Sequence, residues 1–227
     1  MDRELAANYR RVKEAVAAAS TAASRRPDEV RLLAVSKTFP AADIAELYAL
    51  GCRAFGESRV PELEAKAAAL PADIEWHLIG QLQSNKVRRA VKVAAVIHSV
   101  DSVSLLERID RIAGEEGKQP AILLEVNISG EASKSGLPPE ELESAARFAA
   151  ALDHLEFRGL MTIAPADADE GELHRIFGEL RRRRDELSRS LGIELPELSM
   201  GMSGDYAIAI AEGATLVRIG SSIFGRR

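Results

Sequence analysis

The chain has 227 residues, of which 46% are hydrophobic and 29% are charged, and its formal net charge is −5. This composition is typical of a soluble globular protein and argues against a disordered or a membrane chain. No apolar run is long enough to span a bilayer, so we expect no membrane partner. The net negative charge argues against nucleic-acid binding. The single cysteine, Cys52, excludes an internal disulfide, and we expect it to be a small core residue in a reducing compartment.

The first segment, residues 1–24, is predicted to be a leading helix. Leu5, Tyr9, Val12 and Val16 are spaced along one helical face. Acidic residues appear early in this segment, which is unlike a targeting peptide. We therefore expect a cytoplasmic protein.

Short apolar runs alternate with amphipathic segments along the whole chain, which is the pattern of βαβ units. No internal repeat of fixed period accompanies this alternation. Eight runs are candidate strands, at residues 32–36, 52–56, 75–80, 94–99, 121–127, 156–161, 197–200 and 215–220.

Seven candidate helices separate these strands, at residues 41–50, 59–69, 82–92, 103–114, 139–151, 170–190 and 204–212. Ser104, with Glu107 three residues later, gives one of them a start signal. Eight strands with helical crossovers predict a single-domain (β/α)₈ TIM barrel over residues 1–227. An open doubly wound sheet is the alternative, but the first strand is followed by "KTFPAAD" and not by G-x-G-x-x-G.

An arginine run begins at Arg181, within a segment that carries an apolar stripe. The stripe has helical spacing and consists of Leu173, Ile176, Phe177, Leu180 and Leu187. We therefore expect the arginines to face solvent with Glu and Asp partners, in preference to forming a nucleic-acid patch.

Lys37 directly follows the first strand, in "RLLAVSKTFP". In a TIM barrel the active site forms where the carboxyl ends of the strands open into the βα loops. A lysine there either extends its ammonium to the rim or uses its amine as a nucleophile toward a carbonyl group.

The loops after strands seven and eight suit a phosphate group. They contain "MGMSGD" (200–205) and "GSS" (220–222). Ser203 is expected to cap the following helix while offering its hydroxyl, and Gly220 allows a close backbone approach. Each turn alone is equally consistent with a simple tight turn, but two in adjacent loops favour phosphate.

A Schiff-base lysine facing a phosphate site has two chemical interpretations, a class I aldolase or a pyridoxal phosphate (PLP) protein. Arg218 precedes the second phosphate turn and could reach the pyridine nitrogen of a cofactor anchored there. An aldolase would more often need a carboxylate or tyrosine for proton transfer. Arg218 therefore favours PLP, although an ion pair with an inward acidic residue would also account for it.

The chain resembles the pyridoxal phosphate homeostasis protein family. Eight segments look like that family's motifs, in order from near residue 31 to the C-terminus: AVSKTFP, AFGESRVPE, WHLIGQLQSNK, IHSVDS, LEVNISGEASKSG, FRGLMTIAP, LSMGMSGDY and VRIGSSIFG. The resemblance implies a barrel related to the N-terminal domain of alanine racemase.

The resemblance also implies PLP bound covalently to Lys37, phosphate contacts from Ser203, Gly220 and Ser221, and Arg218 facing the pyridine nitrogen. A permanent cation there disfavours protonation of the ring, so the cofactor would be a weak electron sink. The three tyrosines lie in predicted helices, which leaves no obvious proton donor. We therefore predict a PLP carrier without robust catalysis, a monomer that serves apo PLP-dependent enzymes. A PLP-dependent amino-acid racemase is the alternative.

Three further residues complete the predicted site, and a fourth residue, Lys134, competes with Lys37. Ser58 stands where the family pattern leads us to expect asparagine, in "FGES", so its contact with the cofactor or lysine is in doubt. His77 and Met161 are placed toward the barrel mouth by strand position, although either could be barrel packing. Lys134, in a Gly/Ser loop, is a rival amine. We assign no catalytic residue and no metal site.

Overall fold

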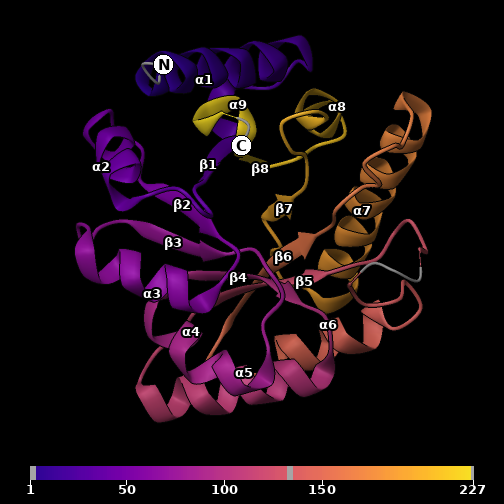
Figure 1. The fold of residues 1–227 in the computed structure, drawn as a ribbon. Coiled ribbons are helices and arrows are strands. Elements are labelled where there is room, and N and C mark those ends of the chain that lie inside the picture. Colours follow the sequence, from indigo (N-terminus) through magenta and orange to yellow (C-terminus); the bar gives the residue numbers. More distant parts are fainter. Residues whose placement is uncertain (1–3, 132–134, 226–227) are drawn as a thin grey trace.

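The computed structural model describes residues 4–131 and 135–225. Eight parallel strands form a closed barrel in chain order, with β8 pairing back onto β1 (Figure 1). This confirms the predicted TIM barrel and shows that the open-sheet alternative is wrong. The strands are β1 (Arg31–Val35), β2 (Ala54–Glu57), β3 (Glu75–Leu78), β4 (Val96–Val100), β5 (Ala121–Glu125), β6 (Glu156–Met161), β7 (Glu197–Ser199) and β8 (Leu216–Ile219).

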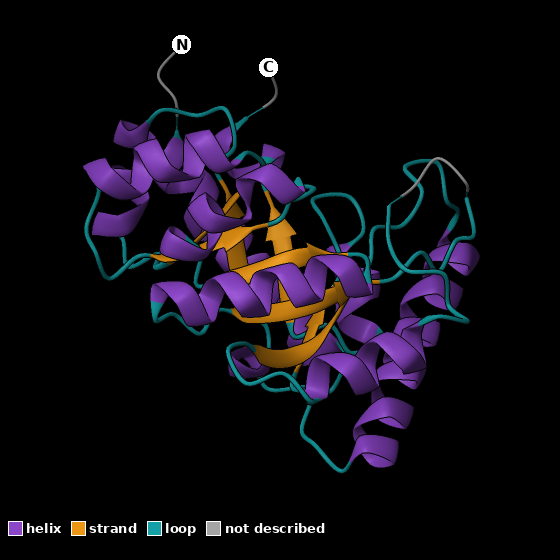
Figure 2. Cartoon of the chain, turned by 90° about the horizontal axis from the view of Figure 1, so that it is seen from below, coloured by secondary structure: helices purple, strands orange, loops and turns teal. Residues whose placement is uncertain are grey.

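Each pair of consecutive strands is joined by one α-helix, as predicted, and these helices enclose the strands (Figure 2). The connecting helices are α2 (Ala41–Ala49), α3 (Val60–Ala69), α4 (Val87–Val93), α5 (Val103–Glu116), α6 (Leu142–Ala150), α7 (Glu170–Leu191) and α8 (Tyr206–Ala211). Two short 3₁₀ turns, η1 (Pro27–Glu29) and η2 (Ser84–Lys86), and a final helix, α9 (Ser221–Phe224), complete the described elements. The predicted helix at 82–92 is therefore η2 followed by α4.

The start of α5 differs from the expected one. Its N-cap is Ser102, whose hydroxyl accepts a hydrogen bond from the Leu105 backbone N–H at 3.3 Å. Ser102 has the extended backbone conformation that an N-cap requires, whereas Ser104 already lies within the helix. The predicted cap at Ser104 is wrong by two residues.

The leading helix α1 (Leu5–Ala22) buries the predicted face. It packs across α8 and α9, so the first helix covers the last two (Figure 1). The Arg25 guanidinium, just beyond α1, donates to the backbone carbonyls of Ile210 and Ala214. Cys52 is buried, as predicted.

The apolar stripe of α7 is buried as predicted. Its arginines pair with acidic neighbours: Arg182 contacts Glu179 and Glu186, and Arg184 contacts Asp185. These contacts confirm the expected partners.

The barrel interior contains one small apolar cluster and several charged groups. Val96, Ala121, Leu123 and Met161 form the cluster. At the amino-terminal end of the strands, Arg31 pairs with Glu75 at 2.6 Å and with Glu197 at 3.4 Å, and Arg158 also pairs with Glu197. Among the described helices, none is long and apolar enough to cross a membrane.

Candidate functional site

Lys37 lies at the carboxyl end of β1 and is exposed. It lines a cavity of about 430 Å³ together with Val35, Phe39, Gly220 and Ser221. Strand β8 pairs directly with β1, and this pairing brings the two ends of the sequence together. The structure therefore unites the predicted nucleophile with one of the two predicted phosphate turns.

Ser58 lies beside Lys37 at the barrel mouth. Val35 of β1 pairs with Gly56 of β2, and Lys37 and Ser58 each come two residues later. Both residues follow the last residues of their strands and stand at the same level of the barrel mouth. Ser58 is partly exposed, and its hydroxyl makes no hydrogen bond to a described residue.

The residues that precede Lys37 and Ser58 form a buried clasp on the outer face of β1 and β2. The Ser36 hydroxyl donates to Glu57 Oε1 at 2.6 Å. Lys66 of α3 donates to the same oxygen at 2.7 Å and to the Ser36 carbonyl at 2.9 Å. Ser36 and Glu57 are fully buried. The clasp, Ser36–Glu57–Lys66, therefore fixes the backbone from which Lys37 projects.

The clasp leaves one polar atom unsatisfied. Glu57 Oε2 is buried and finds no hydrogen-bond partner among the described residues. Burial raises the pKa of Glu57, against the opposing effects of Lys66 and Ser36. An unpaired buried carboxylate oxygen is costly, so the clasp depends on Lys66.

The turn after Lys37 has an uncommon backbone conformation. Thr38 has φ +72°, in the left-handed region that non-glycine residues seldom occupy. Glu62 of α3 accepts the Thr38 backbone N–H at 2.5 Å and also accepts from Lys66 at 2.7 Å. Helix α3 thus holds this turn as well as the clasp. Such conformations gather at functional sites.

Gly220 and Ser221 form the start of α9. A side chain at Gly220 would lie 3.2 Å from the Val35 carbonyl oxygen, so the close approach of these two strand ends favours glycine. The backbone N–H groups of Ile223 and Phe224 both bond to the Gly220 carbonyl. The first N–H groups of any helix lack partners within the helix, which leaves those of Ser221 and Ser222 directed outward.

Ser203 lies in the loop before α8 but does not cap that helix. The N-cap is Asp205, whose carboxylate accepts the Met202 backbone N–H at 2.5 Å. The predicted cap is therefore wrong, because α8 starts later than expected. The Ser203 hydroxyl is partly exposed and bonds to no described residue, so it is available to a ligand. Gly201 has φ +91°, and a Cβ there would lie 2.6 Å from Ala209 Cβ.

Arg218 is 4% exposed and points into the barrel from β8. Its guanidinium donates to the Ser199 hydroxyl at 2.7 Å and to the Thr162 carbonyl at 2.9 Å. These partners are neutral, in place of the inward ion pair that was the alternative for Arg218. Burial lowers the pKa of Arg218 to about 10, and Asp205 and Glu125 oppose this through their charge. The side chain stays cationic at neutral pH.

His77 does not reach the mouth, so its expected placement is wrong. Its ring is 1% exposed and contacts His98 Nε2 at 2.8 Å and Glu75 Oε1 at 2.8 Å. Glu75 is the first residue of β3, and its carboxylate draws the ring toward the amino-terminal end of the barrel. Met161, 1% exposed, packs in the interior apolar cluster. Lys134 lies outside the described residues.

Comparison with known proteins decides the family. The alanine racemase, N-terminal domain family matches residues 3–227. The pyridoxal phosphate homeostasis protein of Aquifex aeolicus (strain VF5) is 41% identical over 218 residues, which cover 96% of this chain and 96% of that protein. The chain belongs to the pyridoxal phosphate homeostasis protein family.

Solved structures agree with this family. An "unknown protein" from Bifidobacterium adolescentis has a TM-score of 0.92 and 42% identity, with coverage of 97% of this chain and 94% of that one. PipY of Synechococcus elongatus PCC7942, in its structure with PLP bound, has a TM-score of 0.83 and 45% identity, with coverage of 92% and 100%.

Several buried polar residues at the barrel mouth and in the barrel interior were not predicted from the sequence. Glu125 ends β5 and is 7% exposed, and burial together with the charge of Asp101 raises its pKa to about 7. His98 and Ser199, both fully buried, hydrogen-bond to each other inside the barrel. Period-two alternation in "VIHSV" could have placed His98 inward, but not its partners, His77 on the neighbouring strand β3 and Ser199 on β7.

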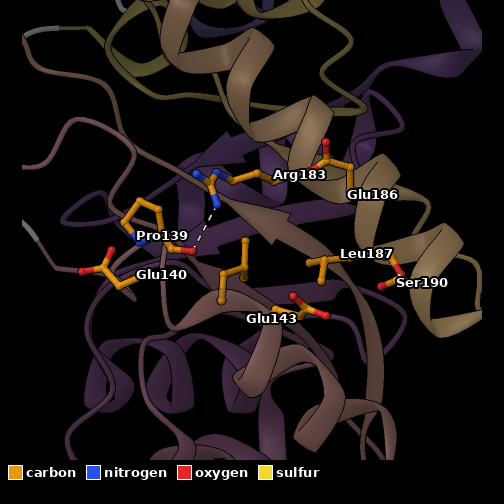
Figure 3. A pocket seen from close by; sticks show the side chains of 8 residues that line it. Pro139, Glu140, Glu143, Arg183, Glu186, Leu187 and Ser190 are labelled. Carbon is orange, nitrogen blue, oxygen red and sulfur yellow. Dashed lines mark hydrogen bonds between the residues drawn. The ribbon is translucent and has the colours of Figure 1, made fainter.

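A second cavity, of about 350 Å³, lies between α6 and α7, outside the barrel (Figure 3). Glu140, Glu143 and Glu186 surround it, and the Arg183 guanidinium turns to the Pro139 carbonyl at 3.1 Å. The charged residues of its lining are three glutamates and one arginine, and that arginine already donates to the Pro139 carbonyl. It is poorly suited to an anionic cofactor, unlike the cavity at Lys37.

Proposed function

We propose that this protein binds pyridoxal 5'-phosphate at the barrel mouth and contributes to the balance of the cellular PLP supply. The observation that carries the proposal is that Lys37 and the Gly220–Ser221 turn line one cavity. An amine and a cluster of backbone N–H donors are the groups that an aldehyde and a phosphate require. The names of the relatives and the PLP-bound PipY structure support the same function.

The donor set fits the cofactor group by group. When bound, PLP supplies an aldehyde with which the Lys37 amine can condense, with loss of water. Ser203, Gly220 and Ser221 hold the phosphate, and Arg218 directs a cation toward the pyridine nitrogen. Ser58 lies beside Lys37 and is short enough that a water molecule would bridge it to the cofactor.

We propose a carrier in preference to a catalyst. Arg218 keeps its positive charge in the barrel, and a cation beside the ring nitrogen opposes the protonation that carbanion chemistry uses. The three tyrosines lie in α1, α2 and α8, as expected from the sequence. Apo PLP-dependent enzymes as recipients, a cytoplasmic location and a monomeric state are part of the same proposal.

The deciding experiment maps the modified lysine. We would incubate the protein with PLP, reduce it with borohydride, and identify the pyridoxyl-lysine by peptide mass spectrometry. We expect the adduct on Lys37 and its loss in Lys37→Ala. Lys118→Ala, an exposed lysine away from the mouth, is the matched control and should label normally. An adduct that persists in Lys37→Ala and disappears in Lys134→Ala would contradict the assignment.

A second measurement separates carrier from enzyme. A racemase would exchange the α-hydrogen of an amino acid with solvent deuterium, and this exchange would depend on Lys37. We expect no saturable exchange with any amino acid. An aldolase would instead be trapped by borohydride only in the presence of a sugar phosphate. Saturable exchange that depends on Lys37, or trapping that requires a sugar phosphate, would refute the carrier proposal.

A further inference from the structure

A continuous line of hydrogen bonds crosses the barrel interior from Arg218 to the opposite end. We call it the interior relay; its members, in order, are Arg218, Ser199, His98, His77 and Glu75. The four contacts between successive members measure 2.7, 2.9, 2.8 and 2.8 Å. They join strands β8, β7, β4 and β3, so only the closed barrel assembles them.

The residues at the two ends of the relay determine which partner donates in each hydrogen bond. Arginine can only donate, so Ser199 Oγ accepts from Arg218. A carboxylate can only accept, and Glu75 is ionised because its hydrogen bond with His77 and its contact with Arg31 lower its pKa to about 2, against the effect of burial. His77 therefore carries hydrogen on Nε2 and donates it to Glu75.

The two histidines continue the line of hydrogen bonds with the same direction of donation. Burial lowers the pKa of both His77 and His98, so each ring is neutral and holds one hydrogen. Since His77 Nδ1 is then bare, it accepts from His98 Nε2. His98 Nδ1 is bare in turn and accepts the hydroxyl proton of Ser199. Every donor meets one acceptor, and the reverse direction would leave a bare His77 nitrogen facing the Glu75 carboxylate.

The far end of the relay opens onto a separate cavity. Glu75 lines a space of about 440 Å³ beneath α1, together with Lys13, Arg31 and Arg53. Its side chain is 37% exposed. The relay thus connects Arg218, the cation predicted to face the cofactor, with Glu75, which solvent reaches at the amino-terminal end of the strands.

We propose that the interior relay orients the Arg218 guanidinium toward the cofactor site, and that the carboxylate of Glu75 anchors this orientation from the opposite end of the barrel. The proposal rests on the proposed function where it concerns the cofactor. Ser199, His98, His77 and Glu75 are then positioning residues. A substitution of Glu75, at the far end of the barrel, then changes the surroundings of the cofactor's pyridine nitrogen at the mouth.

The first test needs no cofactor. Long-range proton–nitrogen NMR spectra of the histidine rings report which nitrogen carries hydrogen. In the cofactor-free protein we expect only the Nε2–H form for His77 and His98. Glu75→Gln should add an Nδ1–H population, because an amide can donate as well as accept. Glu197→Gln removes the same charge at the same end without breaking the relay, and should leave both rings unchanged.

An Nδ1–H form of either ring in the unsubstituted protein would overturn the proposal. Unchanged rings in Glu75→Gln would also overturn the role of Glu75 as the anchor.

The second test uses PLP itself, with affinity and absorption spectrum as readouts. Ser199→Ala removes one of the two acceptors of Arg218, and we expect about tenfold weaker binding, because only the Thr162 carbonyl then holds the guanidinium. The spectrum of bound PLP should also change. Ser199→Thr keeps the hydroxyl, so its affinity for PLP and its spectrum should match those of the unsubstituted protein. Glu75→Gln should shift the spectrum in the same direction as Ser199→Ala.

The outcomes distinguish the relay from the proposed function. If PLP binds equally well and with the same spectrum in Ser199→Ala, Glu75→Gln and the unsubstituted protein, the relay proposal fails and PLP binding stands. If no protein takes up PLP while the histidine rings behave as expected, the proposed function fails and the direction of the relay stands. Thermal unfolding identifies any variant that does not fold.

Discussion

At the scale of single residues, the surroundings of Glu125 at the barrel mouth disfavour the ionised form of its carboxyl group. Glu125 is buried at the end of β5, and Asp101 lies close enough for its negative charge to act on it. Burial is the larger cause, and Arg218 offsets it only partly. Glu125 therefore binds a proton near neutral pH, where an exposed glutamate would not.

The stability of the protein should respond to this group. Because the pKa of Glu125 is raised to about 7 in the folded protein, folding favours its protonated form. Its unfavourable effect is absent below the unfolded pKa, grows as pH rises from about 4.5, and is complete above about 7. Ionisation then costs on the order of 3 kcal/mol.

Glu125→Gln should remove this effect. In urea unfolding, we expect the variant to gain stability relative to the unsubstituted protein by about 2–3 kcal/mol between pH 5 and pH 8. Glu107→Gln, at an exposed position of α5, should show no such trend. A stability difference that is independent of pH would show that Glu125 does not titrate in this range.

At the scale of elements, α3 supports the β1–β2 end from which Lys37 projects. Lys66 reaches the Ser36 carbonyl, Glu57 and Glu62. Glu57 is fully buried and has one unsatisfied oxygen. Removing one partner of a buried ion pair leaves an uncompensated charge, which is more damaging than removing both.

Lys66→Met should therefore destabilise the protein by about 3–5 kcal/mol. Lys66→Met combined with Glu57→Leu should recover much of this loss, because no buried carboxylate remains unpaired. Guanidinium unfolding curves measure both. Lys118→Met, at an exposed lysine, is the control for the loss of the side chain alone. A double variant no more stable than Lys66→Met would argue against the clasp.

At the scale of the whole molecule, α1 links the beginning of the chain to its end. Its buried face packs on α8, which follows the Ser203 loop, and on α9, which begins at Ser221. Asn8 Nδ2 also donates to the Ile223 carbonyl at 3.2 Å. Helix α1 (Leu5–Ala22) is thus packed against the last two helices of the barrel.

Val12→Asp should weaken the entire fold, since Val12 is 6% exposed and a buried unpaired carboxylate costs several kcal/mol, roughly 3 or more. We expect a single unfolding transition at lower denaturant, followed by circular dichroism and by tryptophan fluorescence of Trp76. Lys13→Asp, at the exposed neighbouring position, should change the midpoint little. Separate transitions for the two probes would indicate that α1 unfolds independently.

The sequence by itself determined the order of elements, the barrel and the location of Lys37 at a strand end. These follow from local periodicity, because buried parallel strands are short apolar runs and crossover helices are amphipathic. The same signals predicted the buried faces of α1 and α7. Local patterns were less reliable at helix starts, where Ser102 and Asp205 replaced the expected caps.

Only the tertiary structure decided where the inward polar side chains point. His77 lies on the predicted strand, yet its ring turns to Glu75 and His98 and away from the mouth. The clasp and the interior relay join residues from different strands and helices, and the raised pKa of Glu125 depends on burial. A sequence pattern gives the face of a strand. The direction of a side chain within that face depends on which distant hydrogen-bond partners barrel closure supplies.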